Sequence, residues 1–137
     1  MPTTAAHPRH RRREDGSASI ELVILFPALL ALVTALLQYG LWFYARSLAL
    51  AAAQQGVATA RSYNTDPGTG RDVALAFIDQ HGADTLLDPT ATSVASPGQV
   101  QVVVTGRSLS VLPGVDGPTV TQAATGPIER FVPGGSP

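Results

Sequence analysis

The apolar residues divide the chain into an N-terminal part with one long uncharged run and a C-terminal part with short patterned stretches. The 24 residues from Leu22 to Ala45 carry no charge. As a helix rising about 1.5 Å per residue, this run measures about 36 Å, more than the ~30 Å hydrocarbon core of a bilayer. The pattern predicts a membrane-spanning helix. The alternative is a helix buried inside a soluble domain, but the rest of the chain is too short to cover it on all sides.

Aromatic residues mark the end of this run. Tyr39, Gly40 and Trp42 lie in the stretch QYGLWFYAR, which ends at Arg46. Aromatic rings followed by a cation are typical of the membrane–water interface. Pro27 falls in the second turn, where membrane helices tolerate a proline.

Basic residues flank the run unevenly. Arg11, Arg12 and Arg13 precede it, whereas only Arg46 follows it closely. The positive-inside rule therefore predicts a cytoplasmic N-terminus and an extracytoplasmic C-terminal part. Residues 1–16 contain two prolines and no apolar periodicity, which predicts a disordered basic leader.

The helix is expected to continue beyond Arg46 to about residue 62, because this stretch is rich in alanine. Small residues recur there at four-residue steps along two ridges, which are Ala45, Ala49, Ala53 and Ala52, Gly56, Ala60. Such ridges let other elements approach closely, so they indicate a face for partner helices or for the C-terminal sheet. Alternatively, the alanines are there only because alanine is the best helix former, and the ridges have no partner. Asn, Asp, Pro and Gly cluster in residues 63–70 and are expected to end the helix.

The C-terminal part predicts one more helix and a small sheet. Residues 71–82 place apolar side chains at helical spacing and end in a glycine. Val100, Val102 and Val104 occupy alternate positions, which predicts a strand. Residues 91–96, across a Pro-Gly pair, are a candidate hairpin partner, and residues 119–127 are a candidate third strand.

The predicted fold class is therefore α+β: a long N-terminal transmembrane helix that continues outside the membrane, a short second helix and an antiparallel sheet of about three strands. The predicted segments are a basic cytoplasmic leader (1–16), a transmembrane helix (17–45), an extracytoplasmic extension (46–62), a small α+β module (63–130) and a loose tail (131–137).

Composition and motifs give little sign of catalysis. The chain has no cysteine, which excludes disulfides, thiolate catalysis and cysteine zinc sites. A net charge of −1 gives no support for nucleic-acid binding. His81 has no companion at metal-ligand spacing. The spacing of Asp79, Asp84 and Asp88 lacks the alternation of a calcium loop, so we expect them to be solvated turn residues. No phosphate-binding loop is present, and no base accompanies the serines and threonines. We expect no metal, cofactor, small-molecule substrate or enzymatic activity.

The stretch RRREDGSASIELVILFPALLALV resembles the processing site of type IV pilin-like proteins. In that class a membrane peptidase cuts on the cytoplasmic face after a glycine, and a glutamate lies five residues beyond the cut. The resemblance implies that Gly16 and Ser17 flank the scissile bond and that Glu21 is the fifth mature residue. Ser17 departs from the aromatic first residue common in major pilins, so methylation of the new N-terminus is not implied.

The longer stretch from residue 11 to 62 resembles TadE-like and TadG-like proteins of the tight-adherence (Flp) pilus system. Their pattern has a glutamate, a nearby proline, a late aromatic-glycine pair and an alanine-rich stretch. Glu21, Pro27, Tyr39-Gly40 and residues 51–60 fall on it. The resemblance implies as partners a prepilin peptidase, other pilins and pseudopilins, the Tad membrane machinery and the lipid bilayer.

The chemistry of the residues agrees with such a site. Gly16 has no side chain to obstruct a peptidase and lets the backbone extend. Ser17 or Ser19 suits a helix cap. Glu21 in the first turn is favoured by the helix dipole and costs less near the headgroups than at the bilayer centre. After cleavage, the Ser17 amine would lie about one turn from Glu21. The resemblance implies that a neighbouring subunit's amine pairs with this carboxylate.

The sequence thus predicts a minor pseudopilin, cut after Gly16, that acts in pilus assembly, adherence or secretion through protein–protein contacts in the cytoplasmic membrane. Two alternatives stay open. One is an uncleaved single-pass membrane protein that displays a small extracytoplasmic binding module. The other is a secreted protein released by signal peptidase at the A-x-A-like residues 49–51.

Overall fold

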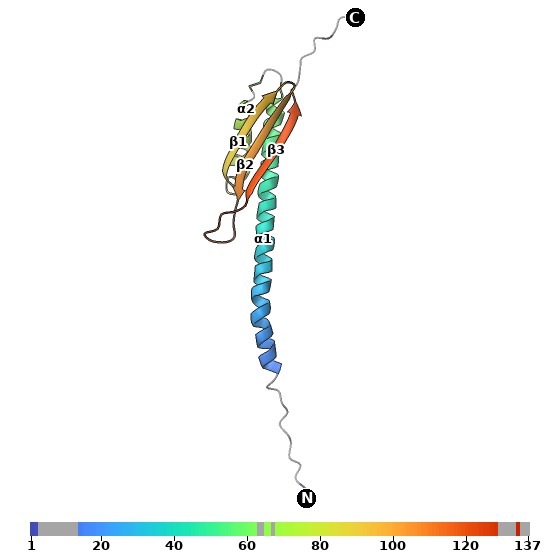
Figure 1. Cartoon of the computed structure of the whole chain (residues 1–137), viewed down its shortest axis with the longest axis vertical. Helices are drawn as coiled ribbons and strands as arrows, with labels where there is room; N and C mark the ends of the chain where they lie inside the picture. Colours follow the sequence, from blue (N-terminus) through green and yellow to red (C-terminus); the bar gives the residue numbers. More distant parts are fainter. Residues whose placement is uncertain (3–13, 63–64, 67, 129–133, 135–137) are drawn as a thin grey trace. The chain divides into compact units, whose positions relative to one another are not determined.

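A computed structural model describes residues 1–2, 14–62, 65–66, 68–128 and 134. Within these residues the chain forms two helices and a three-stranded antiparallel sheet (Figure 1), which confirms the predicted α+β class and order of elements. The chain divides into two compact units, Met1–Leu36 and Leu37–Pro137. The predicted leader and tail lie mostly outside the described residues, and the five predicted segment boundaries stay predictions.

Helix α1 runs Glu14–Ala60, and its N-terminal part belongs to the first unit. Every apolar side chain from Ile20 to Leu36 is exposed. Pro27 lies inside the helix without ending it. The core helix of a soluble protein would be mostly buried, whereas no residue of the most apolar stretch of α1 is buried. This exposure argues against the buried-helix alternative and is compatible with a single-pass membrane protein.

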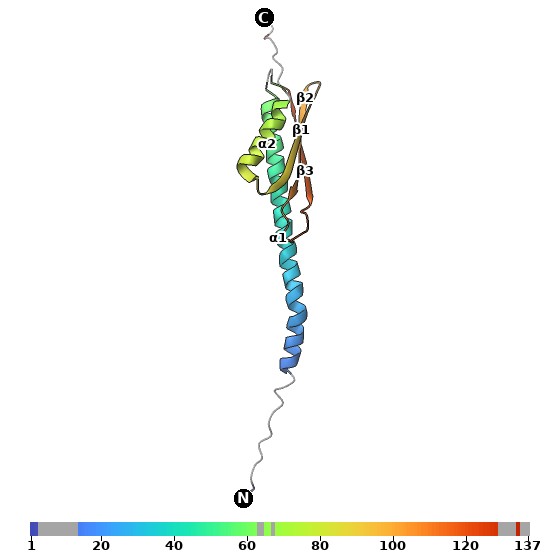
Figure 2. The same ribbon diagram turned by 90° about the vertical axis from the view of Figure 1, so that its left-hand side faces the viewer.

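The second unit packs the C-terminal part of α1 and helix α2, Gly68–Gly82, against one face of the sheet (Figure 2). All six small residues of the two predicted ridges on α1 are buried in this packing. Of the two partners considered for the ridges, the structure selects the chain's own sheet and second helix. The ridges are therefore close-packing surfaces and are not free to receive another helix.

The two helices approach most closely where glycines face each other. A Cβ atom added at Gly56 would overlap the carbonyl oxygen of Gly70. One added at Gly70 would lie 2.9 Å from the Cβ atom of Ala60. Helix α2 begins at Gly68 rather than residue 71 because Asp66 caps it, accepting a hydrogen bond from the Gly68 amide at 3.1 Å.

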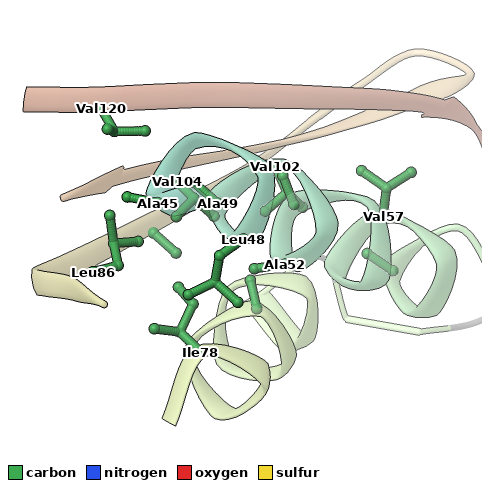
Figure 3. Packing of buried hydrophobic residues seen from close by; sticks show 14 of the residues in the cluster. Ala45, Leu48, Ala49, Ala52, Val57, Ile78, Leu86, Val102, Val104 and Val120 are labelled. Carbon is green, nitrogen blue, oxygen red and sulfur yellow. The ribbon is translucent and has the colours of Figure 1, made fainter. Parts of the chain in front are cut away.

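The sheet has the order β1-β2-β3, with strands Leu86–Ser96, Gln99–Ser108 and Thr119–Pro127. The predicted third strand is confirmed at its bounds. Val100, Val102 and Val104 are fully buried, as the alternation predicts. The core they form also contains Leu48 of α1, Ile78 of α2, Leu86 of β1 and Val120 of β3 (Figure 3).

Strand β1 begins at Leu86, earlier than the predicted residue 91. An Asp-Pro pair interrupts the alternation there, and the structure accommodates it by a register shift between Leu87 and Thr90. Asp88 adopts a positive φ of 48°, a conformation that aspartate tolerates better than most residues. Asp88 is exposed to solvent, as predicted, but it lies in a strand and not in a turn, and it forms an ion pair with Arg107.

Candidate functional site

The residues of the predicted cleavage site lie in the first turn of α1. Because this helix begins at Glu14, Gly16 and Ser17 are helical in the uncut chain, and neither Ser17 nor Ser19 is at its start. One glycine costs a helix only about 1 kcal/mol relative to alanine, and a long apolar helix propagates cooperatively through it. A peptidase that cuts here has to open one turn, and the glycine makes that opening easier.

The surroundings of this turn are open. Apart from its own helix backbone and chain neighbours, none of the described residues places an atom within 4 Å of a Cβ atom added at Gly16. Glu21 is exposed and follows Ser17 by four residues, which is about one helical turn, so it lies in the second turn of α1 and not, as predicted, in the first. Leu22, the first residue of the uncharged run, is 63% exposed. Arg11, Arg12 and Arg13, predicted to set the topology, lie outside the described residues.

The aromatic residues at the end of the run form a connected group in the second unit. The ring of Tyr39 lies 6.0 Å from that of Trp42 and 6.4 Å from that of Phe43, between centroids. The guanidinium carbon of Arg46 lies 5.7 Å from the Trp42 ring centroid. Trp42 packs against the core, whereas Tyr39 is 63% exposed. Gly40 lies beside them in open space, since a Cβ atom added there would have no atom within 4 Å.

The loop between β2 and β3, residues 109–118, is bonded to Gln38, the residue that precedes this group, and no sequence pattern predicted this contact. Gln38 holds the loop with two hydrogen bonds: its Nε2 donates to the Leu109 carbonyl oxygen at 2.9 Å, and its Oε1 accepts from the Val111 amide at 3.0 Å. The sequence feature that could have indicated such a contact is the apolar content of SLSVLPGV, residues 108–115, because connections between strands are usually polar.

Arg107 fixes the other end of this loop. Its guanidinium bonds the carboxylate of Asp88 and, at 3.1 Å, that of Asp116. The hydrogen bond that Arg107 donates to the Asp88 carboxylate raises the pKa of Arg107 most, and the charge of Asp116 raises it further. The two ion pairs of Arg107 connect β1, β2 and the loop.

In the part of the chain that the structure describes, no three histidine or acidic side chains are placed to hold a metal ion. A shallow cavity of about 160 Å³ between α1 and α2 is lined by Gln55, Val73, Ala76, Phe77 and Gln80, none of which titrates near neutral pH.

A comparison with protein-family models gives a match to the N-terminal part of the chain. The family model described as TadE-like protein matches residues 16–58. The matched segment begins at Gly16, contains the exposed apolar helix and ends inside the alanine-rich ridges. This confirms the TadE-like resemblance, over less than half of the chain. No curated protein and no solved structure matches.

Proposed function

We propose that the chain is a minor pseudopilin of a tight-adherence (Flp) pilus, inserted with its N-terminus in the cytoplasm and cut by a prepilin peptidase between Gly16 and Ser17. It acts in pilus assembly, or in the adherence or secretion that the pilus serves, by contact with other proteins. The observation that carries this proposal is the coincidence of the TadE-like match over residues 16–58 with an apolar helix whose side chains are exposed.

The start of α1 supports a role in assembly. A cut after Gly16 leaves the Ser17 amine at the beginning of the helix, one turn from Glu21. In neighbouring copies, the positive Ser17 amine of one chain and the negative Glu21 carboxylate of the next would then both lie at the cytoplasmic edge of the membrane. An ion pair between the amine of one copy and Glu21 of the next would set the axial register of a fibre.

The partners of the proposed function are a prepilin peptidase, other pilins and pseudopilins, the Tad membrane machinery and the lipid bilayer. We assign the chain no catalytic role, no cofactor and no metal. Its chemistry is that of a substrate of processing and a component of an assembly.

An uncleaved single-pass membrane protein is the second candidate, and the unbroken helix across Gly16 and Ser17 favours it. Release by signal peptidase has less support. Ala49 is fully buried in the C-terminal part of α1, so the folded second unit does not expose this site to a peptidase. A cut after Ala51 would also remove Ala45 and Leu48 from the core.

The mass of the mature protein tests the proposal. We expect chain isolated from membranes, and from pili sheared off cells, to begin at Ser17. An intact N-terminus in both fractions would support the uncleaved protein. A start near Ala52 in the medium would support the secreted protein, and either result would contradict the proposed processing.

Glu21→Gln tests the assembly contact. The amide keeps the size of the side chain but removes the charge that would attract a neighbouring amine, so we expect normal cleavage and a severalfold loss of chain from sheared pili. Asp72→Asn, which removes an exposed carboxylate of α2, is the control and should leave the pilus fraction unchanged. Equal recovery of both variants with the pilus would refute the role given to Glu21.

A further inference from the structure

The β2–β3 loop exposes an apolar surface that the proposed function does not use. Four of its ten residues are large and apolar, and all four are exposed: Leu109 by 36%, Val111 by 37%, Leu112 by 49% and Val115 by 55%. Connections between strands are normally polar because they run through water. A group of exposed apolar side chains on one loop marks an interaction surface.

The loop has a defined shape at its tip. The Val115 amide donates to the Leu112 carbonyl oxygen at 3.3 Å, which closes a turn with Pro113 and Gly114 at its centre. Gly114 has a positive φ of 78°, the conformation that the third position of a type II turn requires. The turn places Leu112 and Val115 on either side of the tip.

Both ends of the loop are also fixed. Gln38 binds the Leu109 and Val111 backbone, and Arg107 binds Asp116. The Ser108 amide donates to the Pro118 carbonyl oxygen at 3.0 Å, which joins the two ends. The loop therefore presents its apolar side chains without a large loss of conformational entropy on binding.

The position of Gln38 in the uncharged run identifies the surroundings of the loop. From Leu22 to Gln38 there are 17 uncharged residues. A helix of this length rises about 25 Å, slightly less than the ~30 Å thickness of the hydrocarbon core. If Glu21 marks one edge of the bilayer, Gln38 lies near the other. The backbone of the loop is bonded to Gln38, so the loop lies at the same depth.

The neighbours of the loop fit this placement. Tyr39, Phe43 and Tyr44 are exposed aromatic residues within two turns of Gln38, as expected at an interface. Asp116 follows Val115 directly, and an unpaired carboxylate there would oppose insertion of the loop into lipid. Its carboxylate is paired with Arg107. This pairing lowers the cost of bringing the end of the loop close to lipid.

We propose that the β2–β3 loop is a second membrane contact, which inserts Leu112 and Val115 into the lipid interface of the leaflet on the module's side, beside the aromatic group of α1. The proposal rests on the membrane insertion of α1 that the proposed function contains, but it does not depend on cleavage. The loop and Gln38 then set how deeply the module sits on the bilayer.

Single-cysteine labelling of the full-length chain tests the contact. Because the chain has no cysteine, Val115→Cys and Val94→Cys each create one labelling site. The two valines are matched, with exposures of 55% and 56%, and Val94 lies toward the opposite end of the sheet, paired with Gln101. Each variant carries a small fluorophore in nanodiscs of phosphatidylcholine and phosphatidylglycerol. Leu30→Cys, at a side chain exposed by 57%, reports insertion of α1.

Two quenchers distinguish the outcomes. We expect the label at 115 to be quenched strongly by spin-labelled lipid and severalfold less by iodide than the label at 94. Equal iodide quenching at both positions would overturn the proposal. So would protection of position 115 from both quenchers, since this would mean that protein, such as a second copy, covers the loop.

The label at position 30 separates this proposal from the proposed function. If it is quenched by lipid while position 115 behaves like position 94, the loop contact alone fails. If position 30 is open to iodide, α1 does not enter the bilayer, and both the loop contact and the membrane placement in the proposed function fail. A mature N-terminus other than Ser17 would refute the processing and leave the loop contact standing.

Discussion

Replacing Gly16 by leucine is expected to abolish maturation of the chain and to leave its fold and its insertion intact. Outside the adjacent helix backbone, no described residue has an atom within 4 Å of a Cβ atom at this position, so the described part of the fold accepts the new side chain. A peptidase that reads the backbone at Gly16 meets an obstructing side chain instead. Leucine also favours the helix by about 1 kcal/mol over glycine, which opposes opening of the turn. The ratio of full-length to mature chain, measured by mass in cells that contain the peptidase, checks the effect.

Gly40→Leu is the matched control, because Gly40 lies in the same helix and also has no atom within 4 Å of an added Cβ atom. It makes the same change in helix propensity and should mature normally. Normal maturation of Gly16→Leu would mean that the scissile bond lies elsewhere. A loss of maturation in both variants would show that the effect comes from the membrane helix and not from the cleavage site.

Gly56→Ala is expected to destabilise the second unit by about 1–3 kcal/mol, which is the usual cost of overpacking a core. The new methyl group would overlap the carbonyl oxygen of Gly70 and lie 3.2 Å from Val102. A backbone atom cannot rotate away, so α1 and α2 have to separate. Because small domains have only about 5–15 kcal/mol of stability in total, the loss is large. Thermal unfolding of the full chain in detergent, followed by the fluorescence of Trp42, measures it.

Gly40→Ala again serves as the control. It adds the same methyl group to the same helix without a contact, so we expect unchanged stability or a gain of about 0.4–1 kcal/mol. If Gly56→Ala were as stable as Gly40→Ala, the close approach of Gly56 and Gly70 would not hold the two helices together.

In the proposed function, α1 would serve two purposes, as the membrane anchor and as part of the core of the second unit. The part of α1 beyond Leu37 supplies Ala45, Leu48 and Ala49 to that core. A loop contact beside the aromatic group would add a second attachment to the same surface. The module would then present its sheet and its second helix to partners at a constant height above the lipid.

Much of the architecture followed from local patterns. The uncharged run, the alternation of Val100, Val102 and Val104 and the third strand at residues 119–127 were predictable because helix and strand periods are visible in one segment at a time. The candidate cleavage site was recognisable for the same reason, since Gly16, Ser17 and Glu21 lie in one short stretch. The small-residue ridges indicated close packing, but the residues alone left their partner open.

Contacts between distant segments were decided only by the tertiary structure. In the sequence, Gln38 is only a polar residue within an apolar run. Its hydrogen bonds to Leu109 and Val111 join residues more than 70 positions apart, so no local pattern indicates them. Asp88 read as a turn residue because its partner Arg107 belongs to another strand. Periodicity reports which face of an element is apolar, whereas the choice of partner depends on register and on the path of the chain. For that reason the sequence determined the helices, the strands and the candidate cleavage site, and only the fold revealed the loop bound to α1.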